Sequence, residues 1–199
     1  LASAHRRMVR APVVREAMHP AAARLLASEG LLRRAIFACQ SWLHVHGLEL
    51  VGKVVLEDGS IKERTTRGNR ALWYHHTGLI ETIITLEMAR KHNIRIPSSL
   101  EKRIERAGEI FIQGFEDHSY MDKWAKVAHN SIFTPGKQDF RNKLDLPNGN
   151  SWLYIFSYRY PNLDLTKKLD KILAKYPKNG RMDGYIGFGL GCIYAVAKE

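Results

Sequence analysis

Apolar residues that recur at helical spacing are the feature that most limits what this chain can fold into. Within residues 70–92, Leu72, Leu79, Ile83 and Leu86 follow one another at intervals of seven, four and three positions. These intervals place the four side chains on one face of a helix. No stretch alternates apolar and polar residues strongly enough to build a sheet, so the sequence predicts an all-α fold. Similar spacing predicts further helices over residues 12–30, 31–51, 100–115, 151–158 and 165–176.

Polar and glycine-containing segments mark where these helices are expected to begin and end. Ser98 followed by Glu101 has the spacing of a capping box, which predicts the start of the fourth helix. Asp58-Gly59 predicts a tight turn. Residues 116–150 are rich in polar and aromatic side chains and are expected to form a long irregular segment.

The charge of the chain indicates the class of its partner. The 199 residues include 31 Lys and Arg against 20 Asp and Glu, a formal charge of +11. Such an excess favours nucleic acid, an acidic membrane surface or an acidic polysaccharide. No nucleic-acid-binding motif is present, and no apolar stretch is long enough to cross a membrane. We therefore expect neither nucleic acid nor a membrane as the partner.

The length fits one domain of ordinary size. Residues 1–10 are basic and nearly aperiodic, so we expect an N-terminal arm there, followed by a single α-helical domain over residues 11–199.

The densest group of chemically active side chains lies in DGSIKERTTRGNRALWYHH, residues 58–76. If a helix begins near Asn69, Arg70 and Tyr74 are neighbours one turn apart on the same face. Arg67 then lies at the entry to that face. Positive charges and a helix N-terminus favour the phenolate form of a nearby tyrosine, so Tyr74 is placed to accept or donate a proton. The structural alternative is a half-buried Tyr74 beside solvated arginines.

The same region resembles a known family. Asp58-Gly59-Ser60, followed by RGNRALWYH at residues 67–75, is similar to the DGS…RGxRALxYH signature of alginate lyases and their relatives. The string ARKHN at 89–93, and Trp152-Leu153 followed by YRYP at 158–161, also resemble that family. The resemblance extends over about residues 50–162.

This resemblance implies a polysaccharide lyase that cleaves an acidic, uronate-containing polysaccharide by β-elimination, without a metal or cofactor. It implies that Arg67 neutralises the substrate carboxylate and that Tyr74 serves as base and acid. The family's upstream Asn-Asn-His-x-Tyr-Trp string is missing here, and His19, at about the corresponding place, is the candidate for its histidine. His75 is a further catalytic candidate, with a hydrogen-bonded structural role as the alternative.

The family resemblance also implies an (α/α) toroid, here one that lacks its N-terminal part, and a periplasmic or secreted location. The alternative function is a non-catalytic module that binds acidic glycans on the same helical scaffold. Further candidates for substrate binding are cations that could contact neighbouring carboxylates and aromatic rings that could stack on sugars: Lys62, Arg64, Arg70, Trp73, Trp124 and Trp152.

Overall fold

The structure of the chain is a computed structural model. The chain divides into two compact units, Leu1–Trp42 and Leu43–Glu199, and every described residue belongs to the second. The residues described are 47–127, 132–141, 145–146, 149–161 and 163–175, with the backbone of 182–183 and 187–188. The predictions that lie outside them are the arm at residues 1–10, the helix over 12–30, most of the helix over 31–51, and His19.

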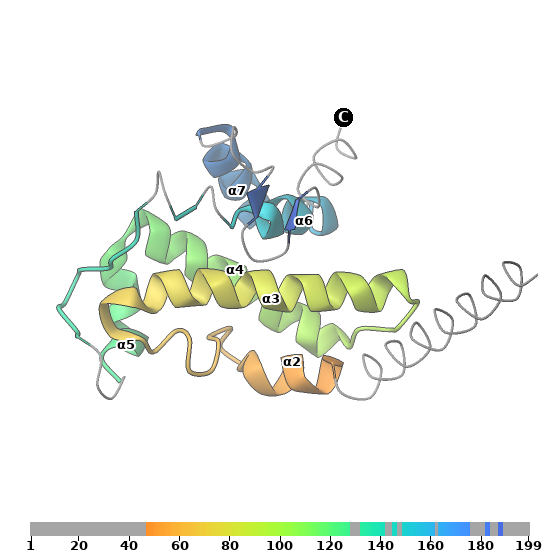
Figure 1. Ribbon diagram of the computed structural model, residues 1–199, viewed down its shortest axis with the longest axis horizontal. Helices are drawn as coiled ribbons and strands as arrows, with labels where there is room; N and C mark the ends of the chain where they lie inside the picture. The colour runs from red at the N-terminus through yellow and green to blue at the C-terminus, as the bar shows by residue number, and fades with distance from the viewer. Residues whose placement is uncertain are drawn as a thin grey trace, which may run out of the picture. The chain divides into compact units, whose positions relative to one another are not determined.

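The long helix α3 (Ala71–Lys91) lies at the centre of the described helices (Figure 1). It contacts α2 (Leu48–Val54), α4 (Ser98–Glu116) and α6 (Ser151–Arg159). Because these neighbours cover α3 on several sides, it buries apolar residues beyond one stripe. The predicted face is nonetheless in the core, where its four residues are at most 3% exposed: Leu72, Leu79, Ile83 and Leu86.

The helix α4 follows α3 after a short connection and also confirms a predicted pattern. Its apolar residues at helical spacing are all buried in the same core as those of α3: Leu100, Ile104, Ala107 and Phe111.

The predicted capping box at the start of α4 is wrong. Ser98 is already the first helical residue, and it makes no capping bond. The carbonyl of Pro97 instead accepts the backbone N–H bonds of Leu100 and Glu101, at 3.0 and 3.1 Å. The Glu101 carboxylate, which the capping box requires at the helix start, is bound by Arg90 of α3.

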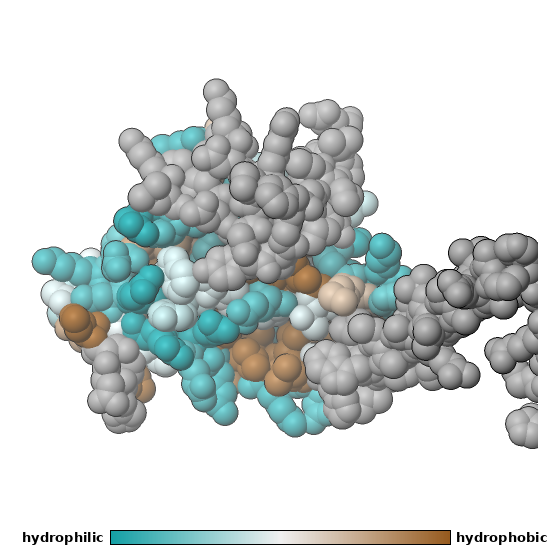
Figure 2. All heavy atoms as spheres, in the orientation of Figure 1, coloured by the Kyte–Doolittle hydropathy of each residue, from teal (hydrophilic) through white to brown (hydrophobic). Residues whose placement is uncertain are grey.

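The C-terminal end of the short helix α2 is hydrogen-bonded to α4, and the predicted turn at Asp58-Gly59 follows it. Arg103 of α4 donates hydrogen bonds to the carbonyls of Gly52 and Val55, at 2.9 and 3.3 Å, and so satisfies acceptors at the end of α2. Hydrophobic side chains gather over α2 in the space-filling view (Figure 2). Leu50 in α2 and Leu56, which follows it, are 54% and 41% exposed.

The later part of the unit is also mainly helical. α6 contacts α7 (Asp164–Lys175), and both helices were predicted within one residue of these bounds. The segment predicted as irregular contains two short helices, η4 (His118–Met121) and α5 (Asp122–Ala125). The tail forms one minimal antiparallel pair, β1 (Met182–Asp183) with β2 (Gly187–Phe188), which sequence periodicity did not indicate. The described residues are mostly helical, which confirms the predicted all-α class apart from this short strand pair.

A network of charged side chains joins α3, α4 and α6 near the C-terminal end of α3. Arg90 binds Glu87 at 2.5 Å and Glu101 at 2.7 Å. Arg159 binds the same Glu87 at 2.6 Å, and the Tyr160 hydroxyl donates to Glu101. Burial and the neighbouring Glu101 raise the pKa of Tyr160, so this hydroxyl keeps its proton. None of the described helices combines the length and apolar character needed to cross a bilayer.

Candidate functional site

The site begins in the loop that precedes α3, where Glu63 and Gly68, on either side of Arg67, both adopt left-handed backbone conformations. Glu63 has φ +60° and Gly68 has φ +55°. The turn at Glu63 directs its carbonyl at Arg67, whose Nε–H donates to it at 2.8 Å. The Arg67 side chain is therefore held by the backbone of its own loop, while its guanidinium is exposed.

The first turn of α3 is capped by a residue from far along the chain. The chain enters α3 through the short helix η3 (Gly68–Arg70), and the N-cap residue Arg70 supplies no capping bond. The Gln138 side chain takes that role: it accepts the Leu72 N–H at 2.9 Å and donates to the Gly68 carbonyl at 3.2 Å. Both bonds are buried, so Gln138 fixes the segment that carries both arginines.

Asn69 ties the same segment to residues 132–139. Its backbone N–H donates to the Ile132 carbonyl at 2.7 Å, and its carbonyl accepts from the Asp139 N–H at 2.5 Å. Its side-chain oxygen accepts from the Thr134 N–H at 2.7 Å. These bonds hold a second segment of chain against the start of α3.

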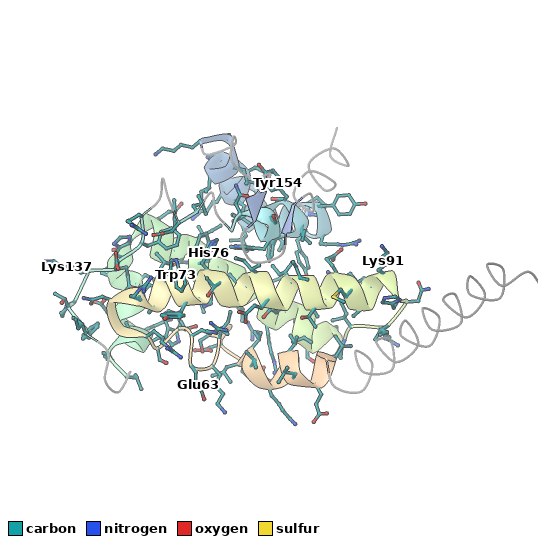
Figure 3. The ribbon with its side chains drawn as sticks, in the orientation of Figure 1. Glu63, Trp73, His76, Lys91, Lys137 and Tyr154 are labelled. Atoms are coloured by element: carbon teal, nitrogen blue, oxygen red, sulfur yellow. The ribbon has the colours of Figure 1, made fainter. Side chains whose placement is uncertain are left out.

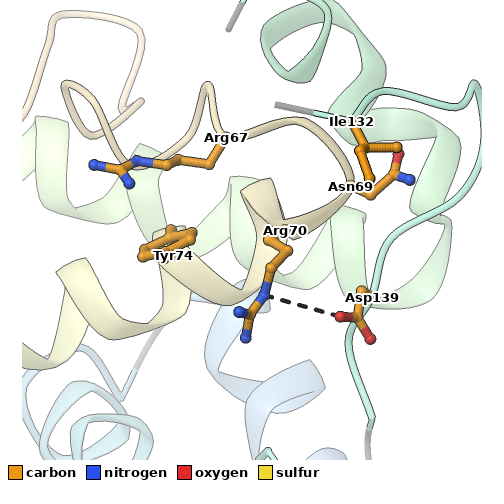
Figure 4. A pocket seen from close by; sticks show the side chains of 6 residues that line it. All are labelled: Arg67, Asn69, Arg70, Tyr74, Ile132 and Asp139. Atoms are coloured by element: carbon orange, nitrogen blue, oxygen red, sulfur yellow. Dashed lines mark ion pairs between the residues drawn. The ribbon is translucent and has the colours of Figure 1, made fainter. Parts of the chain in front are cut away.

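The two segments enclose a pocket of about 370 Å³ that is open to solvent (Figure 4). Its volume is at the lower end of the range of about 300–1,000 Å³ that small-ligand sites occupy. Tyr74 projects from α3 between the arginines in this view. The guanidinium carbons of Arg67 and Arg70 lie 4.7 and 5.7 Å from the centre of the tyrosine ring. The residues that line the pocket are Arg67, Asn69, Arg70, Tyr74, Ile132 and Asp139.

The two arginines differ in their electrostatic partners. Arg70 faces Asp139 across 3.9 Å, and both side chains are at least half exposed. Among the described residues, no carboxylate forms an ion pair with Arg67, whose bond is to a neutral carbonyl. The two guanidinium groups and one carboxylate leave the pocket with a net positive charge. It can therefore hold an anionic group beside a phenol that is able to exchange a proton.

His75 is adjacent to Tyr74 in sequence but points into the core. Its Nε2–H donates to the Ala107 carbonyl, and its Nδ1 accepts from the Thr65 hydroxyl, both at 2.8 Å. Complete burial lowers the pKa of His75 to about 4. This geometry favours the structural alternative, because His75 joins the loop to α3 and α4 and does not line the pocket.

His76, the next residue, lies on the side of α3 that faces α6 (Figure 3). Its Nδ1 accepts the indole N–H of Trp152 at 2.9 Å, so its proton is on Nε2. Burial, followed by the neighbouring His75, lowers the pKa of His76 to about 3. The prediction that Trp152 stacks on a sugar ring is wrong, because the indole is fully buried among Phe111, Phe156 and His76.

The Asp58-Gly59-Ser60 string serves the fold. Asp58 accepts hydrogen bonds from the Ser60 backbone and hydroxyl, at 2.9 and 2.6 Å, and from the indole N–H of Trp124 at 2.9 Å. Partial burial opposes ionisation of Asp58, but these hydrogen bonds outweigh it and lower its pKa. Trp124 is almost completely buried, with Lys123 3.8 Å above its ring, so it is not presented to a ligand.

The remaining candidates lie outside the pocket lining. Arg64 binds Glu81 through two bonds of 2.9 and 3.0 Å, and Lys62 is exposed. Trp73 is half-buried, with its ring 4.8 Å from the Tyr74 ring and Arg70 above it at 4.7 Å. Trp73 thus contacts two pocket residues without lining the pocket itself.

Sequence reasoning missed three pocket residues. Asn69 lies inside the recognised string but carries none of the predicted chemistry. Ile132 and Asp139 are more than 60 positions from Arg70, and no local pattern connects them to it. In the described part of the chain, no three His, Cys, Asp or Glu side chains gather as a metal site.

Comparisons with protein-family models, with curated proteins and with solved structures gave no match for this chain.

Proposed function

We propose that this protein is a polysaccharide lyase that cleaves an acidic, uronate-containing polysaccharide by β-elimination. One observation carries the proposal. Tyr74 lies against the guanidinium of Arg67 in a pocket open to solvent, and no described carboxylate neutralises Arg67. A uronate ring brings the two groups that this pair requires, a carboxylate and an acidic C–H bond beside it.

The reaction follows from these two side chains. Arg67 binds the uronate carboxylate and stabilises the additional negative charge that develops as the C5 proton leaves. Tyr74, reacting as its phenolate, takes that proton and becomes the neutral phenol. The electrons of the C5–H bond form the C4–C5 double bond as the C4–O bond breaks. Tyr74 returns the proton to the departing oxygen, so the products are an unsaturated uronate and a free hydroxyl, and no water is consumed.

The proposal extends to the architecture and the cellular location. α3 with α4, and α6 with α7, are successive helices in contact, which is the unit from which an (α/α) toroid is built. We infer a partial toroid of such pairs. A periplasmic or secreted location follows from the proposed substrate, which is an extracellular polymer.

The test is turnover of polymannuronate, polyguluronate and polyglucuronate, measured by the ultraviolet absorbance of the unsaturated product. Tyr74→Phe keeps the ring and its contact with Arg67 but removes the hydroxyl, so it should abolish elimination and retain glycan binding. Tyr158→Phe is the matched control, because Tyr158 is exposed on α6 and does not line the pocket. Elimination that persists in Tyr74→Phe would assign the proton transfer to another group.

The alternative of a non-catalytic glycan-binding module rests on the net positive charge of the pocket, which binds an anion without any proton transfer. Wild-type protein that binds these polymers and gives no absorbance change would establish this alternative. In that case Tyr74→Phe would lose no more than one hydrogen bond, about 1 kcal/mol.

A further inference from the structure

The pocket contains one acidic side chain, Asp139, directly beside a guanidinium that could otherwise bind substrate. Its backbone is fixed, because its N–H donates to the Asn69 carbonyl at 2.5 Å and the preceding Gln138 caps α3. The carboxylate faces Arg70 in Figure 4. A negative charge on a fixed backbone position therefore lines the pocket beside Arg70.

The ion pair between Asp139 and Arg70 is weak enough to respond to a ligand. The two charged groups are 3.9 Å apart, and the side chains are 63% and 50% exposed. A pair this long and this exposed contributes little free energy. Asp139 therefore does not lock Arg70, but it offsets the positive charge on that side of the pocket. Arg67, on the other side of Tyr74, keeps its full charge.

This asymmetry sets how much negative charge the pocket tolerates. A uronate ring with one carboxylate can place it against Arg67 and direct hydroxyl groups toward Asp139. A ring that also carries a sulfate would bring a second anion close to the Asp139 carboxylate. Like charges 4–6 Å apart at a solvated surface repel by enough to lower affinity about five- to tenfold.

Resting on the proposed function, we propose that Asp139 is a specificity-determining residue that selects uronate rings with a single carboxylate over sulfated uronate rings. It acts through its charge beside Arg70. Asp139→Asn tests this role, because asparagine has nearly the same shape as aspartate but carries no charge.

The experiment compares the affinities of one unsulfated polyuronate, polyglucuronate, and one sulfated glycosaminoglycan, heparin, by calorimetry at a single salt concentration. Asp139→Asn should shift the ratio of the two affinities about five- to tenfold toward heparin. Asp164→Asn is the matched control: it makes the same change in net charge, but Asp164 lies on α7 and pairs with Lys167. Its affinity ratio should equal that of the wild type.

An equal shift of the affinity ratio in both variants would overturn the inference, because the effect would then come from overall charge. An unchanged affinity ratio in Asp139→Asn would overturn it too. Wild-type protein that binds neither polymer would overturn it as well. The elimination assay is a separate measurement. A wild type without elimination whose affinity ratio still depends on Asp139 would refute the lyase and leave the selectivity in place. A wild type that catalyses elimination, with an affinity ratio that Asp139→Asn leaves unchanged, would support the lyase and refute the selectivity.

Discussion

Arg67 and Arg70 flank the same tyrosine, but their partners differ, and this difference predicts which one matters more for turnover. The Nε–H of Arg67 binds a neutral carbonyl, whereas Arg70 shares its charge with Asp139. In the proposed elimination, only Arg67 would therefore present its full charge to the developing dianion. Arg67→Ala should lower kcat about 10²–10³-fold, as the loss of one oxyanion-stabilising donor does, with a smaller effect on substrate binding.

Steady-state kinetics on polymannuronate would measure this loss, with Arg70→Ala as the comparison. The Arg70 variant should lose less in kcat, because its charge is already partly offset. An Arg67→Ala protein that keeps more than half of wild-type turnover would show that the carboxylate is bound elsewhere.

Individual side chains also show where sequence reasoning succeeds. The proximity of Arg67, Arg70 and Tyr74 was predictable, because four positions along a helix bring side chains onto one face. The distances from both guanidinium groups to the Tyr74 ring confirm it. The direction of His75 was not predictable, since adjacent helical residues point about 100° apart and only the surrounding helices decide which direction is buried.

At the scale of an element, the N-terminus of α3 depends on Gln138. Gln138→Ala would leave the buried N–H of Leu72 without its acceptor. An unsatisfied buried donor costs about 1–3 kcal/mol of unfolding free energy. Urea unfolding would measure it, with Lys137→Ala as the control on the exposed neighbouring residue. Equal midpoints for the two variants would show that the Gln138 bonds do not stabilise the helix.

The turn at Gly59 offers a second element-scale prediction. Gly59 has φ +87°, and a Cβ there would lie 2.6 Å from the carbonyl carbon of Arg106 in α4. Gly136 has a similar φ of +70° but open space around it. Gly136→Ala should therefore cost only the conformational penalty, about 1–2 kcal/mol. Gly59→Ala should cost about 1–3 kcal/mol more, because α4 must also shift.

The difference between the two glycine variants, measured by thermal or urea unfolding, isolates the packing of the turn against α4. Equal costs would mean that α4 accommodates the added methyl group without strain.

The elements themselves were largely predictable, and their contacts were not. Helical spacing located α3, α4, α6 and α7, because each helix buries residues that recur every three or four positions. The cap of α3 comes from Gln138, which lies 66 positions after Leu72, and no periodicity links residues so far apart. The same holds for Ile132 and Asp139 in the pocket. Trp152 was misassigned because an aromatic side chain suits a core as well as a sugar ring.

At the scale of the whole molecule, we expect the unfolding free energy to fall in mild acid, because two histidines are buried in their neutral form. The pKa values of His75 and His76 are lowered from 6.5 to about 4 and about 3. In the unfolded chain these histidines therefore become protonated near pH 6.5, whereas in the folded chain they stay neutral at that pH. Their contribution to stability is complete above about pH 6.5 and declines as the pH falls below it. The loss from His75 ends near pH 4 and the loss from His76 ends near pH 3. Each histidine lowers the unfolding free energy by about 1.4 kcal/mol per pH unit within its window.

Urea unfolding at several pH values between 7 and 4 would measure this slope. His75→Gln should be less stable at pH 7 but should lose about 1.4 kcal/mol less per pH unit. Asp58, whose pKa is lowered, adds acid sensitivity only below about pH 4, so it does not obscure the histidine window. A stability that is constant from pH 7 to 5 would contradict the burial of neutral histidines.

The two ends of α3 have separate tasks, and this separation has an evolutionary consequence. Near its C-terminal end, Arg90, Glu87, Glu101 and Arg159 bind α3 to its neighbouring helices. Near its N-terminal end, the pocket residues are exposed or half-buried, and none of them belongs to that network. Substitutions at Ile132 or Asp139 should therefore change the unfolding free energy little, so these positions can vary during evolution. If the pocket binds a polymer as proposed, related proteins with this scaffold can change the polymer they bind while the helical framework stays the same.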